Sequence, residues 1–461
     1  MTAEFFPYMT PPAWTFHIMT FGCKVNQYES QALREAWCAL GGVEVPRAEA
    51  QVTVVNSCAI TARAERETRN ALYRLARENP QGQRILTGCS AHLVGPALQN
   101  TAQDSVQLVH AVIGAPQKSV LLEGPWSVLR GDHNTMQAGL YPPFSIAHYH
   151  RTRPVIKVQD GCSHRCTYCI VPVARGSATS RAPHQVVEEA RRLLGAGHRE
   201  IMLSGINLAQ YGRNCPDYGD FWDLLTLLDR ELAPEWAGVA RFRISSLEPG
   251  QLNTRGIETL SRCAMLCPHL HISLQSGSDT VLRRMGRGHY TARQLVDAIQ
   301  LLQQHWPRMG LGADILTGFP GEKAEHLTET LEVVDALPLT YAHVFPYSRR
   351  PQTPATDFAE QVPHHEKLRR AASIRAAVEK KQDAFLHELL TLDVSHVVLD
   401  GAKGCKGVNE FYTQCRLVSP RGSTTKKVSR EGIVRAKPVA VDKAALVVEL
   451  ARHSSSPRLS P

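Results

Sequence analysis

The sequence lacks any long run of apolar residues. No stretch approaches the roughly 18–20 apolar residues that a membrane-spanning helix needs. The amino terminus, MTAEFFPYMTPPAWTF, also lacks the basic start and apolar centre of a secretory signal peptide. The chain has 461 residues, 43% hydrophobic and 21% charged, as is ordinary for globular proteins. We therefore expect a cytoplasmic protein of two or three domains with no membrane partner.

Cysteine is not scarce, since the chain contains 12. Disulfides rarely persist in the cytoplasm, where organised cysteines more often hold metals or carry out redox chemistry. Cys263 and Cys267, in a segment that looks helical, are better explained by packing than by a metal site. Six other cysteines follow a pattern, which depends on the predicted fold.

The order of predicted elements indicates an α/β protein with three domains. Residues 14–125 alternate β-type runs (WTFHIMTF, QVTVVN, QRILTG) with helical segments, which predicts a parallel sheet covered by helices. Residues 148–380 repeat this alternation six times, which predicts a partial (βα)6 TIM-like barrel with its chemistry at the carboxyl ends of the strands. Residues 381–450 contain short β-runs and predict a small antiparallel β-barrel. Residues 453–461 are expected to be disordered.

The net charge of +9 is concentrated near the carboxyl terminus. Residues 401–461 contain twelve Lys or Arg and four Asp or Glu. This basic block favours a polyanionic partner, with nucleic acid preferred over a membrane because no amphipathic helix accompanies it. A solvated tail that aids solubility is the alternative.

The segment DGCSHRCTYCIVPVARG places three cysteines directly after the first predicted barrel strand. Cys162, Cys166 and Cys169 can converge on one [4Fe–4S] cluster and leave its fourth iron free. A free iron can chelate S-adenosylmethionine, and an electron from the cluster then cleaves the sulfonium bond to give a 5′-deoxyadenosyl radical. The alternative is structural zinc with His164 as a fourth ligand.

A second set of cysteines ends three successive strands of the amino-terminal sheet. Cys23 closes TFGC, Cys58 closes VVNSC and Cys89 closes ILTGC, at spacings of 35 and 31 residues. Each spacing is about one βαβ unit, so in a parallel sheet the three thiols gather at one edge. This arrangement predicts a second cluster with one free iron. Three buried cysteines that only fill space are the alternative.

These motifs together resemble the radical S-adenosylmethionine superfamily. LSGIN (203–207), RISSLEP (243–249), HISLQSGSD (271–279) and ADILTGFPGE (313–322) are similar to the segments with which that superfamily lines its cofactor. The resemblance implies five residues that contact S-adenosylmethionine: Gly205, Asn207, Ser245, Glu248 and Gln275. It leaves Arg175 two roles, either to steady the cysteine loop or cofactor carboxylate, or simply to begin a helix.

With two cysteine triads, residues 14–450 resemble methylthiotransferases, whose amino-terminal domain carries a second cluster and whose last domain is a β-barrel called TRAM. GCKVNQYES and VVNSCAITARAERETRN are most similar to the branch that acts on N6-threonylcarbamoyladenosine beside the tRNA anticodon. The chain departs from the family pattern at four positions, none of them a predicted cluster ligand: His92, Val173, Gln352 and Cys415.

The resemblance implies a methylthio group added to C2 of that adenosine, with two [4Fe–4S] clusters and S-adenosylmethionine as cofactors. The implied partners are the tRNA anticodon stem-loop, an electron donor such as a flavodoxin or ferredoxin, and a sulfur donor. Two alternatives stay open. The target can be isopentenyladenosine in tRNA or a ribosomal-protein side chain, or the chain can be a non-catalytic, metal-containing RNA-binding protein.

Overall fold

The computed structural model describes residues 14–103, 106–132, 140–400, 405–418 and 432–451. Seven of the twelve basic residues of the carboxyl-terminal block, and the segment 453–461 that was predicted to be disordered, lie outside these ranges. Within the described ranges, no helix is both long and apolar enough to cross a membrane.

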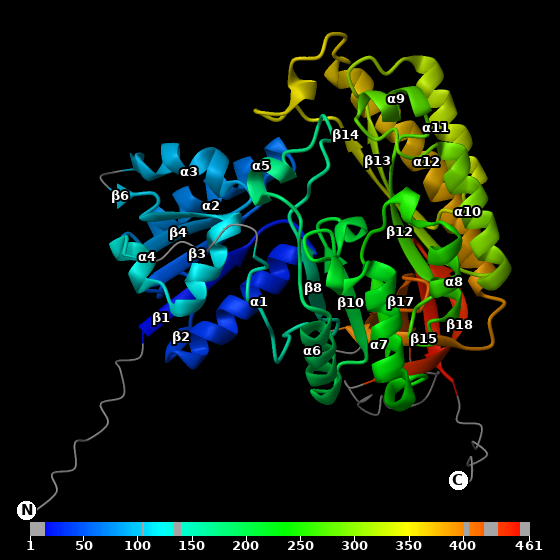
Figure 1. The fold of residues 1–461 in the computed structure, drawn as a ribbon, viewed down its shortest axis with the longest axis horizontal. Coiled ribbons are helices and arrows are strands. Elements are labelled where there is room, and N and C mark those ends of the chain that lie inside the picture. Colours follow the sequence, from blue (N-terminus) through cyan, green and yellow to red (C-terminus); the bar gives the residue numbers. More distant parts are fainter. Residues whose placement is uncertain (1–13, 104–105, 133–139, 401–404, 419–431, 452–461) are drawn as a thin grey trace, which may run out of the picture.

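A parallel five-stranded sheet forms the amino-terminal layer (Figure 1, blue to cyan), in the strand order β2-β1-β3-β4-β7. Its central strands β3 and β4 are buried along almost their whole length because both faces are covered. Val54 and Ile85 face a core shared with α1, whereas Val55 and Leu86 face α2 and α3. The elements are β1 (Trp14–Thr20), α1 (Lys24–Ala39), β2 (Gly42–Glu44), β3 (Val52–Ser57), α2 (Ala62–Glu78), β4 (Gln83–Gly88), α3 (Ala91–Gln99), β7 (Ala111–Gly114) and α4 (Trp126–Arg130), with a small hairpin of β5 (Ala102–Gln103) and β6 (Val106–Gln107) and a 3-10 helix at Ala115–Glu123.

Six parallel strands form the central partial barrel. Two isolated bridges, Phe242 to Leu266 and Leu247 to Ile272, join its two sheets into the order β8-β10-β11-β12-β13-β14, and the two-residue β9 (Thr179–Ser180) pairs antiparallel to β8. The strands are β8 (Val155–Asp160), β10 (Glu200–Gly205), β11 (Arg241–Ile244), β12 (His269–Gln275), β13 (Gly310–Thr317) and β14 (Tyr341–Pro346). The helices are α5 (Val171–Arg175), α6 (Pro183–Gly195), α7 (Phe221–Trp236), α8 (Thr254–Arg262), α9 (Asp279–Arg284), α10 (Ala292–His305), α11 (Ala324–Ala336) and α12 (His364–Leu389).

The open side of this barrel faces the amino-terminal layer through α1, which packs against β8 (Figure 1). One continuous apolar core runs across this contact, from Phe16 and Trp37 to Ile156 and Leu203. This shared core fixes the first strand of the barrel against the amino-terminal layer.

The last described strands close into a five-stranded barrel, which confirms the predicted α/β class with a terminal β-barrel. Its strands are β15 (Ser395–Asp400), β16 (Lys406–Val408), β17 (Gln414–Val418), β18 (Ile433–Asp442) and β19 (Ala445–Leu450). Four of the pairings are antiparallel as predicted, but β17 and β19 are parallel.

The turn between β16 and β17 docks on the amino-terminal end of the central barrel. Arg243 donates hydrogen bonds to the carbonyls of Asn409 and Glu410, at 2.9 and 3.1 Å. The Tyr412 ring lies 4.8 Å from the His269 ring, and the Arg243 guanidinium lies 5.0 Å from the Tyr412 ring. This turn therefore plugs the barrel end opposite the predicted chemistry.

Candidate active site

The three amino-terminal cysteines follow adjacent strands of one parallel sheet. Cys23 lies between β1 and α1, Cys58 follows β3 and Cys89 follows β4, and β3 pairs with both β1 and β4. The Cys89 amide donates to the carbonyl of Ser57 at 3.0 Å, so the two neighbouring cysteines start from adjoining backbone. The structure thus places all three at the same sheet edge.

Two glycines allow the chain to turn this sharply beside the cysteines. Gly22 has a φ of +88°, and a Cβ there would lie 2.6 Å from Cβ and 2.7 Å from Sγ of Cys58. Gly88 has a φ of +93°, and a Cβ there would lie 2.3 Å from the carbonyl oxygen of Ser57. Only glycine combines a left-handed conformation with so close an approach.

Burial raises the pKa of Cys23 and Cys58. Cys58 and Cys89 are buried and Cys23 is half-buried. Burial, with smaller effects from Cys89 and Cys23, raises the pKa of Cys58 to about 11, and burial also raises the pKa of Cys23. A ligand that binds thiolates must therefore supply compensating positive charge, as a metal group does.

A buried network of charged side chains joins this edge to the first strand of the central barrel. The Arg175 Nε donates to the Cys89 Sγ at 3.2 Å, and its Nη1 donates to Asp160 at 2.8 Å and to Glu29 at 3.1 Å. Lys118 and Lys157 complete the network by donating to Glu29. Three cations thus face two carboxylates, and the excess positive charge lies beside the thiols.

The second triad lies on the loop that follows β8. Cys162 donates its amide to the Gly176 carbonyl at 3.0 Å, and Cys169 donates its amide to the Cys166 carbonyl at 3.1 Å. All three cysteines line one cavity of about 310 Å³. Burial raises the pKa of each, to about 12 for Cys169.

Three of the five residues predicted to contact S-adenosylmethionine line the same cavity: Asn207, Glu248 and Gln275. The Asn207 amide lies 3.8 Å from the Cys162 Sγ. Gly205 and Ser245 lie at or just after the ends of β10 and β11, but they are not among the residues that line the cavity.

Sequence reasoning missed Arg287, which also lines the cavity. It pairs with both carboxylate oxygens of Glu248, and its Nη1 lies 3.8 Å from the Cys166 Sγ. Burial opposes ionisation of Glu248, yet hydrogen bonds from His289 and Arg287 hold its pKa below the usual value. The pair joins two loops about 40 residues apart, and no local spacing reveals such a contact.

Ile60 and Thr61, which follow Cys58, form another part of the cavity wall. The amino-terminal layer therefore contributes directly to the cavity that contains the second triad. Sequence patterns place Cys58 at a sheet edge, but they do not indicate that the next residues line a site on another sheet.

In each cysteine triad at least one Sγ–Sγ distance exceeds 4.8 Å, which is wider than expected for three thiolates on one zinc ion. Three thiolates on one zinc, with Zn–S bonds of about 2.3 Å, lie about 3.8 Å apart. Within the described ranges, the single group of His, Cys, Asp or Glu whose three ligand atoms all lie within 4.8 Å of one another contains no cysteine. A wider spacing fits an iron–sulfur cluster, whose irons supply positive charge to the thiolates. The buried Arg175 beside Cys89 can offset the net negative charge of such a cluster together with its three thiolates.

Comparison with known families places two models on the chain. Residues 156–334 match the radical SAM superfamily, and residues 15–111 match the uncharacterized protein family UPF0004. Together these matches cover the two segments that contain the cysteine triads.

The chain is similar to curated relatives over most of its length. It is 35% identical to a threonylcarbamoyladenosine tRNA methylthiotransferase MtaB of Bacillus subtilis, over 82% of this chain and 83% of the relative. It is 32% identical to the protein of the same name in Thermotoga maritima, over 91% and 96%. It is 33% identical to a tRNA-2-methylthio-N(6)-dimethylallyladenosine synthase of Syntrophobacter fumaroxidans, over 80% and 81%.

Among solved structures, the fold resembles that of the radical S-adenosylmethionine methyltransferase TsrM of Kitasatospora setae. The TM-score is 0.55 at 15% identity, over 75% of this chain and 77% of that one. This likeness concerns the fold alone.

Proposed function

Because the chain belongs to the methylthiotransferase family of radical S-adenosylmethionine enzymes, we propose that it adds a methylthio group to C2 of N6-threonylcarbamoyladenosine beside the anticodon of tRNA. The supporting observation is one cavity whose wall includes the Cys162 triad and also Ile60 and Thr61, which directly follow a cysteine of the other triad. The substrate follows the names of the relatives in Bacillus subtilis and Thermotoga maritima.

As a member of this family, the enzyme uses an iron–sulfur cluster and S-adenosylmethionine. We assign one [4Fe–4S] cluster to Cys162, Cys166 and Cys169 and a second to Cys23, Cys58 and Cys89. When bound, a three-cysteine cluster supplies a free iron for S-adenosylmethionine at the first site or sulfur at the second, and the first also supplies the electron that cleaves the cofactor. The C2–H bond of adenine has no acidic proton, so radical chemistry suits it better than a general base.

The protein side chains bind, orient and exclude water. Asn207, Glu248 and Gln275 offer amide and carboxylate groups to the amino, carboxylate and ribose groups of the cofactor. Arg287 holds the Glu248 carboxylate in a bidentate pair, which keeps it ionised and oriented inside the cavity. Leu316 and Ile170 add apolar walls that keep water from a reactive radical.

The mouth of the cavity suits an unstacked base. Ile60 and Phe345 line the cavity and are exposed, at 54% and 41%. Aromatic and apolar side chains stack on bases that are splayed out of single-stranded loops. An adenosine of the anticodon loop can enter here without the stem having to open.

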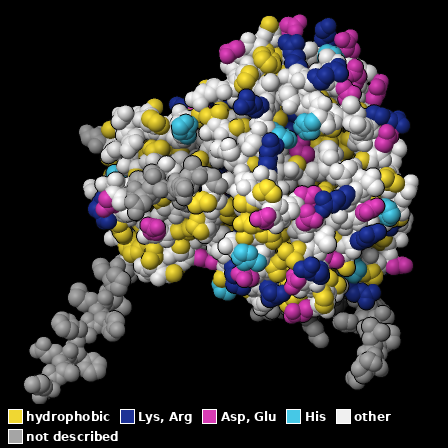
Figure 2. All heavy atoms as spheres, in the orientation of Figure 1, with side chains coloured by type: hydrophobic (Ala, Val, Ile, Leu, Met, Phe, Trp, Pro, Cys, Tyr) yellow, Lys and Arg dark blue, Asp and Glu magenta, His cyan; other side chains and the backbone are white. Residues whose placement is uncertain are grey.

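Binding of the RNA phosphates requires positively charged side chains outside the cavity. On the face shown in Figure 2, Lys and Arg side chains are interspersed with Asp and Glu side chains, and neither sign covers a large area. The terminal barrel contributes exposed Arg435 and Lys437 on β18. We propose that this barrel holds the RNA backbone.

The two clusters need partners of their own. A flavodoxin or ferredoxin would supply electrons, and a separate donor would supply sulfur. A tRNA substrate also agrees with a cytoplasmic location.

The experiment that tests this function is nucleoside mass spectrometry of total tRNA from cells with and without the gene. Loss of 2-methylthio-N6-threonylcarbamoyladenosine, with the unthiolated nucleoside accumulating, is the expected result. Loss of the 2-methylthio derivative of isopentenyladenosine would instead identify the dimethylallyladenosine activity for which some relatives are named. Unchanged tRNA with an altered ribosomal protein would overturn the RNA assignment.

Anaerobic reconstitution tests the number of clusters. Two clusters predict about eight irons per chain, and reduction in the presence of S-adenosylmethionine should release 5′-deoxyadenosine. About four irons, unaffected when Cys23, Cys58 and Cys89 are replaced by alanine, would overturn the second cluster.

A further inference from the structure

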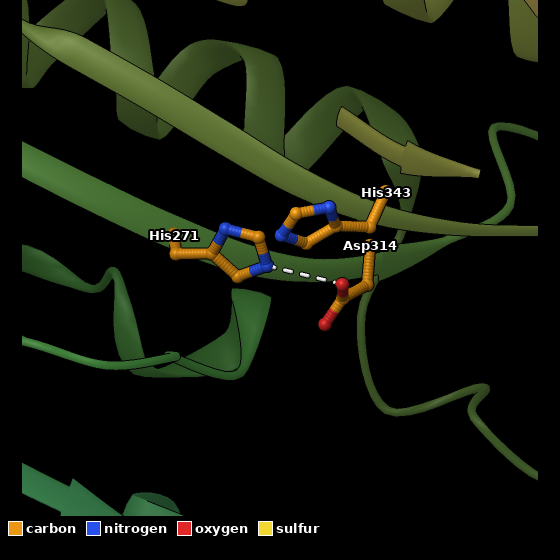
Figure 3. Close-up of side chains that lie close together, drawn as sticks. All are labelled: His271, Asp314 and His343. Carbon is orange, nitrogen blue, oxygen red and sulfur yellow. Dashed lines mark ion pairs between the residues drawn. The ribbon is translucent and has the colours of Figure 1, made fainter. Parts of the chain in front are cut away.

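A group of three possible metal ligands extends from strands β12, β13 and β14: the buried His271, the half-buried Asp314 and the exposed His343 (Figure 3). The His271 Nε2 lies 3.1 Å from the Asp314 Oδ1, and one ligand atom from each residue lies within 4.8 Å of the other two. Asp314 pairs with His343 in the strand register, and His271 pairs with Gly312 on the same face. Neighbouring strands about 4.8 Å apart therefore bring the three side chains together.

A hydrogen bond at the ring nitrogen that faces away from Asp314 fixes the orientation of His271. Its Nδ1 lies 3.0 Å from the Tyr341 hydroxyl, which also lies 2.9 Å from the His269 Nε2, and the His271 side chain is buried. Histidines that bind metals commonly use the second ring nitrogen in such a hydrogen bond, which directs the first nitrogen to the ion.

Gly312 makes room for this arrangement. A Cβ at this position would lie 2.2 Å from the Tyr341 Cζ and 2.6 Å from the His271 Nδ1. Any other residue would push the phenol away from the imidazole. A glycine at this position of β13 therefore permits the contact between Tyr341 and His271.

His343 completes the group without a competing partner. Its ring lies 5.4 Å from the His271 ring and 6.3 Å from the Phe345 ring, and its hydrogen-bonding nitrogens have no partner among the residues that the structure describes. In Figure 3 the two imidazoles and the carboxylate point toward one another.

We propose that His271, Asp314 and His343 bind one divalent transition-metal ion, distinct from the two cysteine sites. Two imidazole nitrogens and one carboxylate suit Zn²⁺, Fe²⁺ or Mn²⁺ and leave coordination positions open. Bonds of about 2.0–2.2 Å put neighbouring ligand atoms about 3.0–3.5 Å apart, and the His271–Asp314 distance of 3.1 Å already meets this requirement.

The unfilled coordination positions of this ion could bind a group of the substrate. Asp314 lines the cavity that contains Cys162, Cys166 and Cys169. If the proposed function holds, the substrate adenosine carries a threonylcarbamoyl group, and threonine contributes a carboxylate. A cation at this wall binds that carboxylate and gains nothing from an uncharged dimethylallyl group. The ion therefore selects among modified adenosines.

Zinc binding by the reconstituted holoenzyme tests the site. The probe is Zn²⁺, counted per chain by mass spectrometry beside iron, for the wild type, His343→Ala and Asp314→Asn. His198→Ala is the matched control, a half-buried histidine that hydrogen-bonds to the Thr152 carbonyl away from the barrel interior. The wild type and the control should bind one more zinc than either variant, or bind it at least tenfold more tightly, at equal iron content.

X-ray absorption of the zinc-loaded enzyme identifies the ligands. Nitrogen and oxygen neighbours at about 2.0–2.2 Å, without sulfur at about 2.3 Å, are expected. Equal zinc content in all four proteins, or sulfur in the zinc shell, would overturn the site.

Binding of anticodon stem-loops tests the assigned role. Removing zinc with a chelator should weaken binding of the stem-loop that carries threonylcarbamoyladenosine at least tenfold and leave the unmodified stem-loop unaffected. Metal-independent binding of both RNAs would overturn the carboxylate assignment. If the enzyme thiolates another adenosine, the proposed function fails, whereas the zinc count still decides the metal site.

Discussion

At the scale of single residues, Arg175 has the most demanding position in the molecule. It contacts Cys89, Asp160, Glu29 and Asn26 at once, through three different nitrogens. A guanidinium can make this fork of bonds, and an ammonium cannot. Asp160 accepts hydrogen bonds from Arg175 and from the Gly161 amide at the start of the cysteine loop. Arg175 ends α5, so the predicted role of beginning a helix is wrong. Its contact with sulfur is to the other triad.

Replacing Arg175 should therefore damage the amino-terminal triad first. Arg175→Met leaves two buried carboxylates with one cation fewer, which costs about 3–5 kcal/mol of folding free energy. Arg175→Lys keeps the charge and should cost less, but it loses the bond to Cys89. We expect iron per chain to fall toward half in both variants, measured after anaerobic reconstitution. Full iron content in Arg175→Lys would show that the contact with sulfur is dispensable.

Gly22 offers a second test, because a close control exists. Gly22→Ala forces a left-handed alanine and drives its Cβ into Cys58, whereas Gly41, with a φ of +83°, has nothing within 4 Å of its Cβ position. Both substitutions should cost about 1–2 kcal/mol through backbone strain. Only Gly22→Ala should also lose iron, as absorbance and metal analysis would show. Equal iron loss in both variants would mean that strain alone is responsible.

At the scale of elements, β10 and β11 are tied to the terminal barrel by a buried charge cluster. Glu200 on β10 accepts hydrogen bonds from Arg241 and Arg243 on β11. Burial alone would raise the pKa of Glu200, but Arg243 and Arg241 lower it to about 2. The same arginines donate to backbone carbonyls of residues 396 and 408–410.

This cluster should make stability depend on pH. A carboxyl whose pKa falls from about 4.5 to about 2 stabilises the fold by about 3 kcal/mol at neutral pH. The contribution is complete above pH 4.5 and declines as the pH falls toward 2, because protons then bind the unfolded chain first. Glu200→Gln should lower the melting temperature at pH 7 and lower it less at pH 3, measured by circular dichroism. A constant difference would contradict the shifted pKa.

Elements also show where sequence reasoning succeeds. The positions of Cys23, Cys58 and Cys89 could be predicted because each ends an apolar run, and parallel strands end at one edge. The Cys263–Cys267 segment was wrongly predicted to be helical, since α8 ends at Arg262 and the Asp229 carboxylate accepts hydrogen bonds from Cys263 and Met265. The turn depends on the Asp229 carboxylate, which lies more than 30 residues earlier in the chain, so the local sequence does not reveal it.

The group of His271, Asp314 and His343 could be predicted only in part from the sequence. Alternation along each strand shows that His269 and His271 share a face, and so do Tyr341 and His343. It does not show the register between strands, which decides whether the three side chains meet. Pairs such as Arg287 with Glu248 depend on the same long-range packing.

At the scale of the whole molecule, the terminal barrel is part of the catalytic fold. Deleting residues 390–461 removes the carbonyls that Arg241 and Arg243 use and the Tyr412 ring packed against the barrel end. We expect such a truncation to lower the melting temperature and impair reductive cleavage of S-adenosylmethionine as well as RNA binding. A truncated enzyme with normal cleavage and stability would contradict this.

Surface substitutions should separate RNA binding from stability. Arg435→Glu with Lys437→Glu changes two exposed side chains on β18. Affinity for the anticodon stem-loop should fall, and the slope of log affinity against log salt should lessen by about one to two units, since fewer counterions are released. The melting temperature should stay constant. An unchanged slope would place the RNA backbone on another face.

The buried charge network between α1 and β8 has a consequence for the ancestry of the chain. Glu29 lies on one side of the seam, and Lys157, Asp160 and Arg175 lie on the other. A recombination event that exchanges residues 14–125 between diverged genes would leave these buried charges without partners, unless the matching residues of the second segment are exchanged as well. The two segments must therefore be inherited as a pair, although they fold around different sheets.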